Sequence, residues 1–289
     1  MKMTITGHTK LTGLLGSPVS HSISPLMHNT AFEQLDLNYA YLCFDTGNIL
    51  LKNAVNALCS LNARGWNCTM PTKQEMCELC NELSPAARMI GAVNTVVNEN
   101  GTLIGHNTDG IGYMRSICDT GLDLKGQTMT LLGAGGAATA IAIQAALDGL
   151  AKINLFVRKG RSLEHAVKIS DTINTKTNAT ATLYDINDTN ALQSAINQSL
   201  LLTNGTSVGM TPKEEDCVLP LTITFPKTLT VSDIIYNPRQ TQLLKRAAEA
   251  GCPTQNGLYM LLYQGAEAFR LWTGKEMPVE YIKQHYFTL

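Results

Sequence analysis

Short apolar runs alternate with longer amphipathic segments along the whole chain. Compact apolar runs predict strands, and segments with an apolar residue every three or four positions predict helices. In the first third, the pattern predicts strands at 11–16, 39–44 and 64–70, and helices at 24–35, 48–61 and 72–83. Strands that alternate with helices indicate a mostly parallel sheet with both faces covered.

Local signals mark where some of these elements begin and turn. Ser24 followed by Pro25 is typical of a helix start, with Ser24 as the N-cap. Asn100-Gly101 lies between two apolar runs, which predicts a hairpin over 92–109. We expect this hairpin to supply an antiparallel edge to the sheet.

The second half of the chain continues the alternation. A helix is predicted from about 111 to 120, and further strands are predicted at 128–133, 152–158, 182–186, 200–206 and 229–236, with a helix at 137–150. The segments 257–274 and 278–287 are helical by their period and rich in Tyr, Leu and Trp. Such helices need a surface to cover, so we expect them to pack back on the first part of the chain.

Composition narrows the classes of partner. The chain has 289 residues and a mass of 31.3 kDa, which favours two domains. Its 22 basic and 23 acidic residues nearly cancel, so no global field favours nucleic acid or an anionic membrane, and small molecules are the expected partners. Apolar runs fall short of the roughly 18 residues of a spanning helix, and the N-terminus lacks a signal-peptide pattern. We expect a cytoplasmic protein.

Eight cysteines are scattered along the chain, a spread typical of reduced, buried thiols. Cys77 and Cys80 form a C-x-x-C, but it lies inside the predicted helix at 72–83 and no second pair has the spacing of a metal site. No metal site is predicted.

The sequence GAGGAA at 133–138 lies between a predicted strand and a predicted helix. This G-x-G-x-x-A pattern provides a tight turn, small residues for close approach and a helix N-terminus, which together bind the pyrophosphate of a dinucleotide. An ordinary glycine turn and the adenosyl site of a methyltransferase are the alternatives at this loop.

The end of the next strand distinguishes the two nicotinamide dinucleotides. NAD sites usually carry an acidic residue there, whereas a 2′-phosphate is bound by cations. Val157 is followed by Arg158, Lys159, Gly160 and Arg161, so three cations and no carboxylate favour NADP. The alternative is a solvated basic turn.

Lys73 ends the stretch NCTMPTK and has no acidic neighbour in sequence. An enzyme that transfers hydride from an alcohol also needs a group that exchanges the hydroxyl proton, and a lysine oriented by a carboxylate can do this. Asp109 in HNTDG is the candidate carboxylate. Taken alone, Lys73 is a surface lysine and Asp109 a turn residue or helix cap.

Eight spaced motifs occur in order: GSPVSHSISPLMHN, NCTMPTK, GAVNTVV, HNTDG, LLGAGGAA, TNGTSVGM, IIYNP and GLYMLLYQGAEAFRLWTG. Through them the chain resembles the shikimate dehydrogenase family over essentially its full length, and it is most similar to the quinate/shikimate dehydrogenase branch. The resemblance implies an α/β fold of two lobes with the active site in the cleft between them. A substrate-binding lobe with a mostly parallel sheet would comprise 1–108 plus 258–289, and a Rossmann NAD(P)-binding lobe would comprise 109–257.

The resemblance also implies roles for individual residues. Lys73 and Asp109 correspond to the catalytic pair, with Pro71 ending the strand and Lys73 in the first turn of the following helix, aimed into the cleft. The implied substrate contacts are Ser22 and Ser24 for the carboxylate, Tyr41 as in the quinate-using branch, and Thr69, Asn94, Tyr236 and Gln264. The implied cofactor contacts are Gly133, Ala134, Gly135, Gly136, Ala137, Val157, Arg158, Lys159, Ser207, Ile234 and Gly257.

The implied reaction is the reversible, metal-independent, NADP-dependent reduction of 3-dehydroshikimate to shikimate in aromatic biosynthesis, by a monomer or homodimer. Two departures from the quinate-using branch bear on the cofactor: Gly160 replaces an aspartate that permits NAD, and Ser207 replaces a lysine. The first change removes a contact to NAD, and the second removes a positive charge near the cofactor. Because the two changes act in opposite senses, NAD stays the alternative cofactor. The alternative functions are a dehydrogenase with quinate and NAD as main substrates, and a nucleotide-binding regulator without catalysis.

Overall fold

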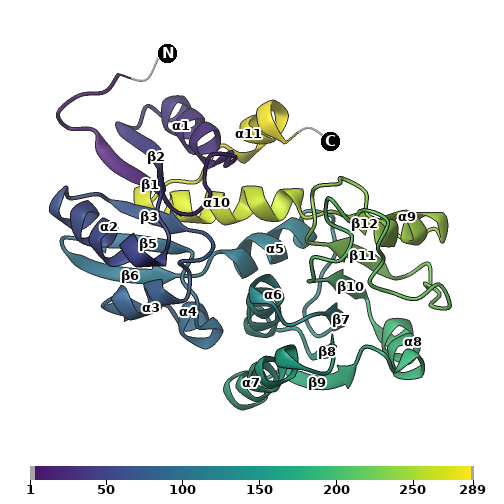
Figure 1. Ribbon diagram of the computed structural model, residues 1–289. Helices are drawn as coiled ribbons and strands as arrows, with labels where there is room; N and C mark the ends of the chain where they lie inside the picture. The colour runs from purple at the N-terminus through teal and green to yellow at the C-terminus, as the bar shows by residue number, and fades with distance from the viewer. Residues whose placement is uncertain (1–3, 288–289) are drawn as a thin grey trace. The chain divides into compact units, whose positions relative to one another are not determined.

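The first sheet and its helices come from the N-terminal third and the C-terminal end of the chain (Figure 1). The computed structural model describes residues 4–287. The strands are β1 (Lys10–Gly16), β2 (Tyr39–Asp45), β3 (Gly65–Cys68), β4 (Glu82–Leu83), β5 (Thr95–Glu99) and β6 (Thr102–His106). The helices are α1 (Ser24–Gln34), α2 (Asn48–Ser60), α3 (Glu75–Leu79), α4 (Pro85–Ile90), α10 (Leu258–Thr273) and α11 (Val279–Tyr286).

The six strands lie in the order β2-β1-β3-β5-β6-β4. The predicted hairpin is confirmed: β5 and β6 pair antiparallel, and Asn100 and Gly101 have φ angles of 55° and 96°, the left-handed values of a tight two-residue turn. The predicted position of this hairpin at the sheet edge is wrong. β4 pairs in parallel outside β6, so the antiparallel strand β5 lies in the interior.

The single helix predicted at 72–83 is also wrong. α3 ends at Leu79, and Asn81 then pairs with the sheet: its N–H donates to the Leu103 carbonyl (2.9 Å), and its Oδ1 accepts from the Leu103 N–H (2.7 Å). This pairing carries the chain into β4. α4 follows with Ser84 as its N-cap and Gly91 at φ 71° as its end, a start and stop signal that the hydrophobic pattern alone passed over.

Helices cover both faces of this sheet (Figure 1). α2, α3 and α4 pack on one face through a cluster that includes Leu51, Val55, Met76 and Trp66. α1, α10 and α11 cover the other face, where aromatic rings stack on one another. A sheet buried on both sides explains why its strands read as nearly continuous apolar runs.

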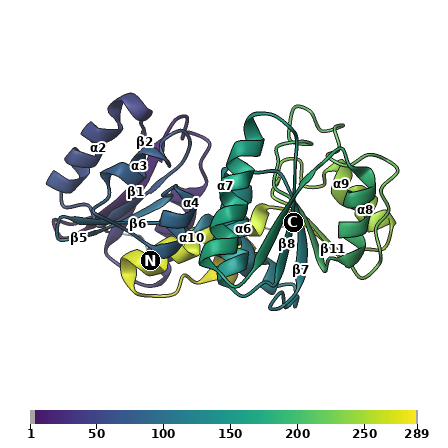
Figure 2. The ribbon, with the colours of Figure 1, turned by 90° about the horizontal axis from the view of Figure 1, so that it is seen from below.

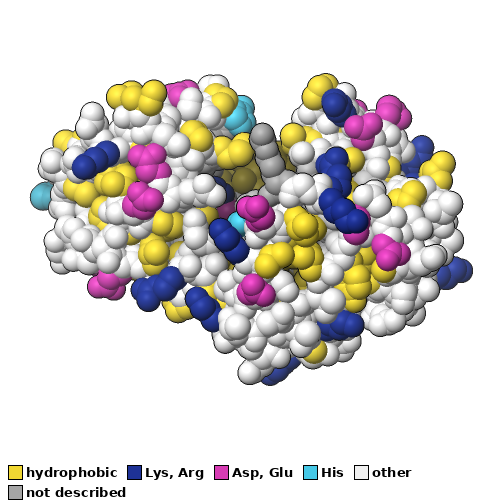
Figure 3. Space-filling view, turned by 60° about the horizontal axis from the view of Figure 1, so that its bottom comes forward, with side chains coloured by type: hydrophobic (Ala, Val, Ile, Leu, Met, Phe, Trp, Pro, Cys, Tyr) yellow, Lys and Arg dark blue, Asp and Glu magenta, His cyan; other side chains and the backbone are white. Residues whose placement is uncertain are grey.

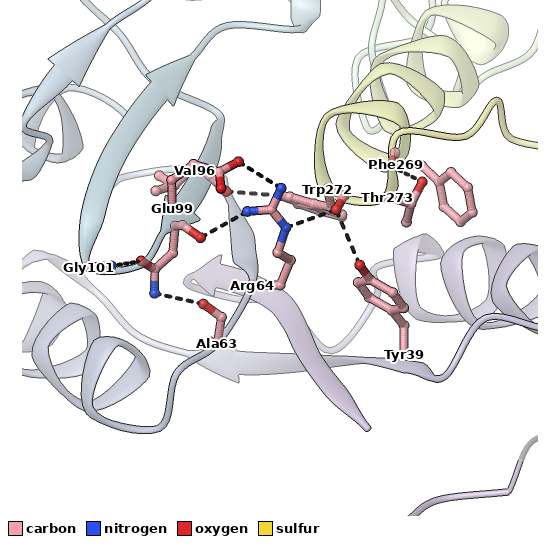
Figure 4. Close-up of polar contacts among 10 residues, drawn as sticks. Tyr39, Ala63, Arg64, Val96, Glu99, Gly101, Phe269, Trp272 and Thr273 are labelled. Carbon is pink, nitrogen blue, oxygen red and sulfur yellow. Dashed lines mark hydrogen bonds and ion pairs between the residues drawn. The ribbon is translucent and has the colours of Figure 1, made fainter. Parts of the chain in front are cut away.

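Arg64 bonds helix α10 to the sheet (Figure 4). Its Nε donates to the Trp272 carbonyl and one Nη donates to Glu99, both at 2.9 Å. The Trp272 indole N–H donates to the Val96 carbonyl at 2.9 Å, and the Tyr39 hydroxyl donates to the Trp272 carbonyl at 3.3 Å. The prediction that the final helices pack on the first part of the chain is confirmed.

The second sheet is parallel throughout and lies between two helix layers, α6 and α7 on one side and α8 and α9 on the other (Figure 2). Its strands are β7 (Thr128–Leu132), β8 (Lys152–Val157), β9 (Thr180–Asp185), β10 (Leu201–Asn204), β11 (Thr230–Asp233) and β12 (Thr254–Gln255). Its helices are α5 (Asp109–Cys118), α6 (Gly136–Leu147), α7 (Arg161–Lys176), α8 (Thr189–Gln198) and α9 (Gln242–Glu249). The order β12-β11-β10-β7-β8-β9 is that of a Rossmann sheet, in which the winding reverses between β7 and β10.

The hydrophobic pattern predicted five of these strands but not β12, and the sequence analysis assigned no helix to α7, α8 or α9. Apolar residues at helical spacing are nevertheless buried in α8, at Leu192, Ala195 and Ile196. Two of the three helices also carry a start signal: the Asp188 side chain accepts from the Ala191 N–H, and the Thr241 hydroxyl accepts from the Leu244 N–H. The sequence therefore carried signals for these helices that the analysis passed over.

The chain divides into two compact units, one formed by residues up to Thr108 and from Leu262 onward, the other by Asp109–Leu261. The second division falls within α10, whereas the sequence analysis placed it before that helix. Positions 1–3 and 288–289 of the predicted substrate lobe lie outside the described residues. Which ligand each unit binds stays a prediction at this point.

Charged side chains of both signs are interspersed on the face drawn in Figure 3. Between residues 4 and 287, each helix is too short or too polar to cross a membrane.

Candidate functional site

Lys73 lies in a turn at 70–74, directly before α3. Its predicted place in the first turn of the helix is wrong, because α3 begins two residues later. Lys73 is half-buried, and its carbonyl accepts the Val93 N–H at 2.8 Å. The turn is closed by Thr72, whose N–H and hydroxyl both donate to the Thr69 carbonyl at 2.9 Å.

Asn94 follows Val93 and collects bonds from the segment that leads to Asp109. The Asn94 N–H donates to the His106 carbonyl (3.0 Å), and its Oδ1 accepts the Thr108 N–H (2.7 Å). Asp109 is the next residue and the first of α5. The main chain at Lys73 thus bonds Val93, and the main chain at Thr108, immediately before Asp109, bonds Asn94. Val93 and Asn94 are consecutive residues.

A buried chain of hydrogen bonds begins at Tyr41. The Tyr41 hydroxyl donates to Asn67 Oδ1 at 2.8 Å. Tyr41 is 0% exposed, and burial raises its pKa well above the ordinary value. Tyr41 is therefore a neutral phenol whose hydroxyl bonds the Asn67 side chain.

The chain continues from Asn67 to Asn94. The Asn67 Nδ2 donates to Thr95 Oγ1 (2.9 Å) and to the Asn94 carbonyl (3.2 Å), and the Thr95 hydroxyl donates to Asn94 Oδ1 (3.1 Å). The Asn94 Nδ2 then donates to Thr108 Oγ1 (3.0 Å) and to Gln264 Oε1 (3.5 Å). Tyr41, Asn94 and Gln264 are thus brought into one network, although they are far apart in sequence.

Ser24 is not the N-cap of α1 as predicted. The helix already includes Ser24, its N-cap position is Ile23, and the Ser22 hydroxyl accepts the Ser24 N–H at 3.2 Å. The Ser24 side chain is therefore not used in capping.

Thr69 and Tyr236, like Ser22 and Ser24, lie outside this network. Thr69 is half-buried just after β3, and its N–H donates to the Leu15 carbonyl at 2.9 Å. Tyr236 belongs to the other unit, follows β11 and is 44% exposed.

The predicted phosphate loop lies at the reversal point of the second sheet. Gly133 directly follows β7 and has φ 100°, and a Cβ on it would lie 2.6 Å from the Thr206 methyl group. Gly205 directly follows β10, and a Cβ there would lie 2.8 Å from that of Ala138 in α6. By contrast, a Cβ on Gly135 or Gly136 would meet no described atom within 4 Å. Gly133 and Gly205 let the chain pack closely, whereas Gly135 and Gly136 leave the N-terminus of α6 open to a ligand.

The end of β8 differs from the sequence expectation. Val157 is buried and Arg158 and Lys159 are exposed, as a cationic turn requires. Lys159 Nζ, however, lies 3.2 Å from Asp185 Oδ2, at the end of the neighbouring strand β9. The pKa of Asp185 is lowered, first by the Asn187 backbone N–H and also by Lys159. A carboxylate therefore lies beside these cations, contributed by a strand that the local sequence did not include.

The loops after β10 and β11 are held by a buried carboxylate, Asp233. It accepts from the Ile235 N–H (3.0 Å), the Thr241 hydroxyl (2.8 Å) and the Asn204 amide (3.1 Å). Burial raises its pKa to about 6. The predicted cofactor residues Ser207, Ile234 and Gly257 lie on or beside these loops: Ser207 is exposed, and the Gly257 N–H donates to the Ile235 carbonyl at 3.0 Å. A Cβ on Gly257 would collide with the Ile234 carbonyl.

Across residues 4–287, His, Cys, Asp and Glu form no group of three that could hold a metal ion. All eight cysteines are free, but only Cys68 and Cys252 are buried and Cys118 is exposed, so the expectation of generally buried thiols is wrong.

Comparison with known proteins identifies the family. Residues 14–96 match the shikimate dehydrogenase substrate binding domain, and residues 257–285 match the shikimate 5′-dehydrogenase C-terminal domain. The chain is 51% identical over 283 residues to the shikimate dehydrogenase (NADP(+)) of Listeria innocua, which covers 98% of this chain and 97% of the relative. The chain belongs to the shikimate dehydrogenase family.

Two further members of the family are informative. The quinate/shikimate dehydrogenase of Escherichia coli is 45% identical over 283 residues and is matched over 98% of both chains. The crystal structure of shikimate 5-dehydrogenase from Listeria monocytogenes, in complex with shikimate and NAD, superposes with a TM-score of 0.95 at 50% identity and covers 98% of each chain. The resemblance to shikimate dehydrogenases and the expected α/β fold are confirmed.

Three members of the hydrogen-bond network were missed from sequence: Asn67, Thr95 and Thr108. Each is buried, and each lies within a motif that carried the family resemblance. A buried asparagine or threonine must find a partner, so polar residues inside such motifs were the available signal. The sequence could not show that they bond to one another.

Proposed function

We propose that this protein is a shikimate dehydrogenase that catalyses the reversible, NADP-dependent reduction of 3-dehydroshikimate to shikimate in aromatic amino acid biosynthesis. The observation that carries the proposal is its likeness, over nearly the full length, to relatives named for this activity. The network from Tyr41 to Gln264 supports it independently, because it gathers neutral hydrogen-bonding groups of the kind that bind a polyhydroxy acid.

The substrate-binding part of the proposal assigns Ser22 and Ser24 to the carboxylate, and Thr69, Asn94 and Gln264 to the ring hydroxyls. Tyr236 and Tyr41 complete the proposed set. A site that hydrogen-bonds hydroxyl groups rejects analogues that lack them, because its own buried groups are then left without partners. Such a site distinguishes shikimate from apolar acids of similar size.

Lys73 and Asp109 are the proposed catalytic pair. Lys73 takes the proton from the reacting hydroxyl during oxidation and returns it to the carbonyl oxygen during reduction, and Asp109 orients the ammonium group. The ties of both segments to Val93 and Asn94 support this pairing. Lysine suits the role because its pKa responds strongly to burial and neighbouring charge.

A nicotinamide cofactor supplies the hydride donor or acceptor when it is bound. The residues that would hold it are Gly133, Ala134, Gly135, Gly136 and Ala137 at the pyrophosphate, Val157, Arg158 and Lys159 at the adenosine ribose, and Ser207, Ile234 and Gly257 towards the nicotinamide. The open approach to Gly135 and Gly136 at the start of α6 fits a pyrophosphate bound by backbone N–H groups.

Quinate with NAD is the second candidate pair. The likeness to the Escherichia coli quinate/shikimate dehydrogenase and the carboxylate of Asp185 beside Lys159 favour it. We place it second because the more similar of these two relatives is named for NADP and because Arg158 is exposed in the same turn.

The test is kcat/KM for shikimate and for quinate, each with NADP and with NAD. We expect shikimate with NADP to give the highest value. A higher value for quinate with NAD would reverse the order of the two candidates, and no turnover with any pair would support a nucleotide-binding regulator instead. We further propose that the enzyme acts in the cytoplasm as a monomer or homodimer, which light scattering on the purified protein distinguishes.

A further inference from the structure

Two buried polar residues lie in register at the ends of strands β10 and β11. Asn204 is the last residue of β10, Asp233 is the last of β11, and the two are partners in the parallel pairing. Both are 0% exposed, and Asn204 Nδ2 donates to Asp233 Oδ1 at 3.1 Å. The carboxyl ends of parallel strands are where ligands bind. The loops that begin at this pair carry Ser207 and Ile234.

The Asn204 side chain holds the first loop on both sides of Ser207. Its Oδ1 accepts the Thr206 N–H (3.0 Å) and the Thr206 hydroxyl (2.7 Å), and its Nδ2 donates to the Val208 carbonyl (3.3 Å). The Thr206 hydroxyl in turn accepts the Val208 N–H at 3.1 Å. Ser207 is exposed between two residues that both bond Asn204.

The second loop is bonded to the same pair through its main chain. The Ile235 N–H donates to Asp233 Oδ1 at 3.0 Å, and the Ile234 N–H donates to the Asn204 carbonyl at 3.1 Å. The Ile235 carbonyl accepts the Gly257 N–H at 3.0 Å. Ile234 and Gly257 are therefore linked to the two residues that hold the first loop.

The direction of the Asn204 amide is determined by its neighbours. Burial raises the pKa of Asp233 to about 6, so above that pH it is a carboxylate, which can only accept. The Val208 carbonyl also only accepts, and the Thr206 N–H only donates, so Nδ2 must face the first two and Oδ1 the third. The Thr241 hydroxyl donates to the other Asp233 oxygen at 2.8 Å. Loss of one member leaves several buried groups without partners.

We propose that Asn204 and Asp233 are positioning residues, which hold the loops after β10 and β11 so that Ser207, Ile234 and Gly257 align the nicotinamide ring for hydride transfer. This inference rests on the proposed function, since that function assigns those three residues to the nicotinamide side of the cofactor. Loss of the pair should weaken binding of the nicotinamide half and lower kcat. Binding of the adenosine half should be unchanged, because it is assigned to the loops after β7 and β8.

The principal variant is Asn204→Ala. We expect the Kd for NADPH to rise about fivefold, the effect of losing one well-formed hydrogen bond, and kcat to fall about tenfold because the hydride donor is misaligned. The Kd for adenosine 2′,5′-bisphosphate, which has no nicotinamide, should stay within about twofold of wild type. Calorimetry and steady-state kinetics measure these quantities. A variant that is merely less stable would lose affinity for both ligands.

A matched pair of threonine variants separates positioning from general stability. Thr206→Val keeps the branched shape but removes the hydroxyl that bonds Asn204 Oδ1 and the Val208 N–H, and it should lower kcat about threefold. Thr130→Val is the control, because Thr130 is buried in β7 and its hydroxyl bonds that of Ser199 at 2.9 Å, outside both loops. It should lower Tm and leave kcat and the Kd for NADPH as in wild type.

The conservative variant Asp233→Asn should retain function. Its Oδ1 can still accept from Asn204 and from the Ile235 N–H, and its Nδ2 can donate to the Thr241 hydroxyl. We therefore expect a wild-type kcat in Asp233→Asn, whereas Asp233→Ala should lower kcat as Asn204→Ala does.

Four results would overturn the inference: wild-type kcat and NADPH affinity in Asn204→Ala, equal losses of affinity for NADPH and adenosine 2′,5′-bisphosphate, equal effects of Thr206→Val and Thr130→Val, or a kcat in Asp233→Asn as low as in Asp233→Ala. Each leaves an active wild-type enzyme, so the proposed function would survive. A wild-type protein that does not reduce 3-dehydroshikimate would refute the proposed function, and the titrations with NADPH would still test the loops.

Discussion

The two units of the protein prepare their sites in opposite ways. In the first unit, side chains from β2, β3 and α10 join in one hydrogen-bond network that includes Tyr41, Asn67, Asn94 and Gln264. In the second, the predicted site is mostly main chain, with Gly133 and Gly205 allowing close packing and Gly135 and Gly136 leaving a helix N-terminus open. One unit orients side chains, and the other leaves space at a helix N-terminus, where we propose that a phosphate binds.

This difference teaches which kind of site is sensitive to which change. In the first unit a conservative change of one polar atom disturbs several others, because buried polar groups depend on one another. In the second unit the size of a residue matters more than its polarity, because the backbone itself supplies the donors. The following predictions test that contrast, starting with the largest expected effect.

Removal of one side chain from the first unit should stop the chemistry. Lys73→Ala is expected to lower kcat by about 10² to 10⁴, the usual contribution of a general acid–base, while shikimate still binds. Steady-state kinetics and calorimetry measure the two quantities. Lys52→Ala, an exposed lysine on α2 of the same unit, is the control and should behave as wild type. A fully active Lys73→Ala enzyme would remove the proposed mechanism.

Asp233 shows that the second unit also depends on one buried side chain, for stability. Its pKa rises from 3.8 to about 6 on folding, so the folded state binds the proton more tightly than the unfolded chain between these values. The free energy of unfolding should therefore fall by about 3 kcal/mol as pH rises through this window and then level off.

Urea unfolding between pH 4 and pH 7 measures this slope, and Asp233→Asn should flatten it. The asparagine can still accept from Ile235 and can donate to the Thr241 hydroxyl, so the variant should fold. An identical slope in the variant would assign the pH dependence to other groups.

Two glycine variants should separate packing from ligand access. Gly133→Ala should destabilise the protein by about 2 kcal/mol, because the added methyl group meets Thr206 and the backbone has φ 100°. Gly135→Ala should leave Tm unchanged and raise the KM for NADP about tenfold, because its methyl group would occupy the approach of the pyrophosphate. Equal losses of Tm in both variants would contradict this division.

The smallest expected effect concerns the choice of cofactor. Asp185→Asn should raise the ratio of kcat/KM for NADP to that for NAD by about two- to fivefold, the range of an exposed ion pair. The change removes a carboxylate that competes with a 2′-phosphate for Lys159. Raised salt should reduce the difference. A ratio that falls in the variant would mean that Asp185 aids NADP by orienting the lysine.

Sequence reasoning was most successful where the signal is local. The hairpin at Asn100-Gly101, the glycine loop at 133–136 and the periodic helix α10 are all present, since each depends on residues close together in the chain. It failed at 72–83, where pairing with β6 ends a helix that the apolar period favoured. The period cannot report a competing strand that comes later in the sequence.

The candidate site divides in the same manner. Family motifs identified Ser24, Tyr41, Asn94 and Gln264 individually, and they also contained Asn67 and Thr95 without giving a reason to select them. Asp185 was missed because it lies well beyond the cationic turn in sequence, although its Oδ2 is 3.2 Å from the Lys159 Nζ in the folded protein.

The amino-acid sequence by itself determined the alternation of strands and helices, the dinucleotide loop and the family, because these depend on periodicity and on motifs of a few residues. Only the tertiary structure decided that Asn29 of α1 bonds the Tyr41 main chain, that Asn67 links Tyr41 to Asn94, and that a carboxylate accompanies the cations after β8. Each of these is a contact between elements distant in the chain. Their hydrogen bonds form only when the elements pack, so no local pattern encodes them.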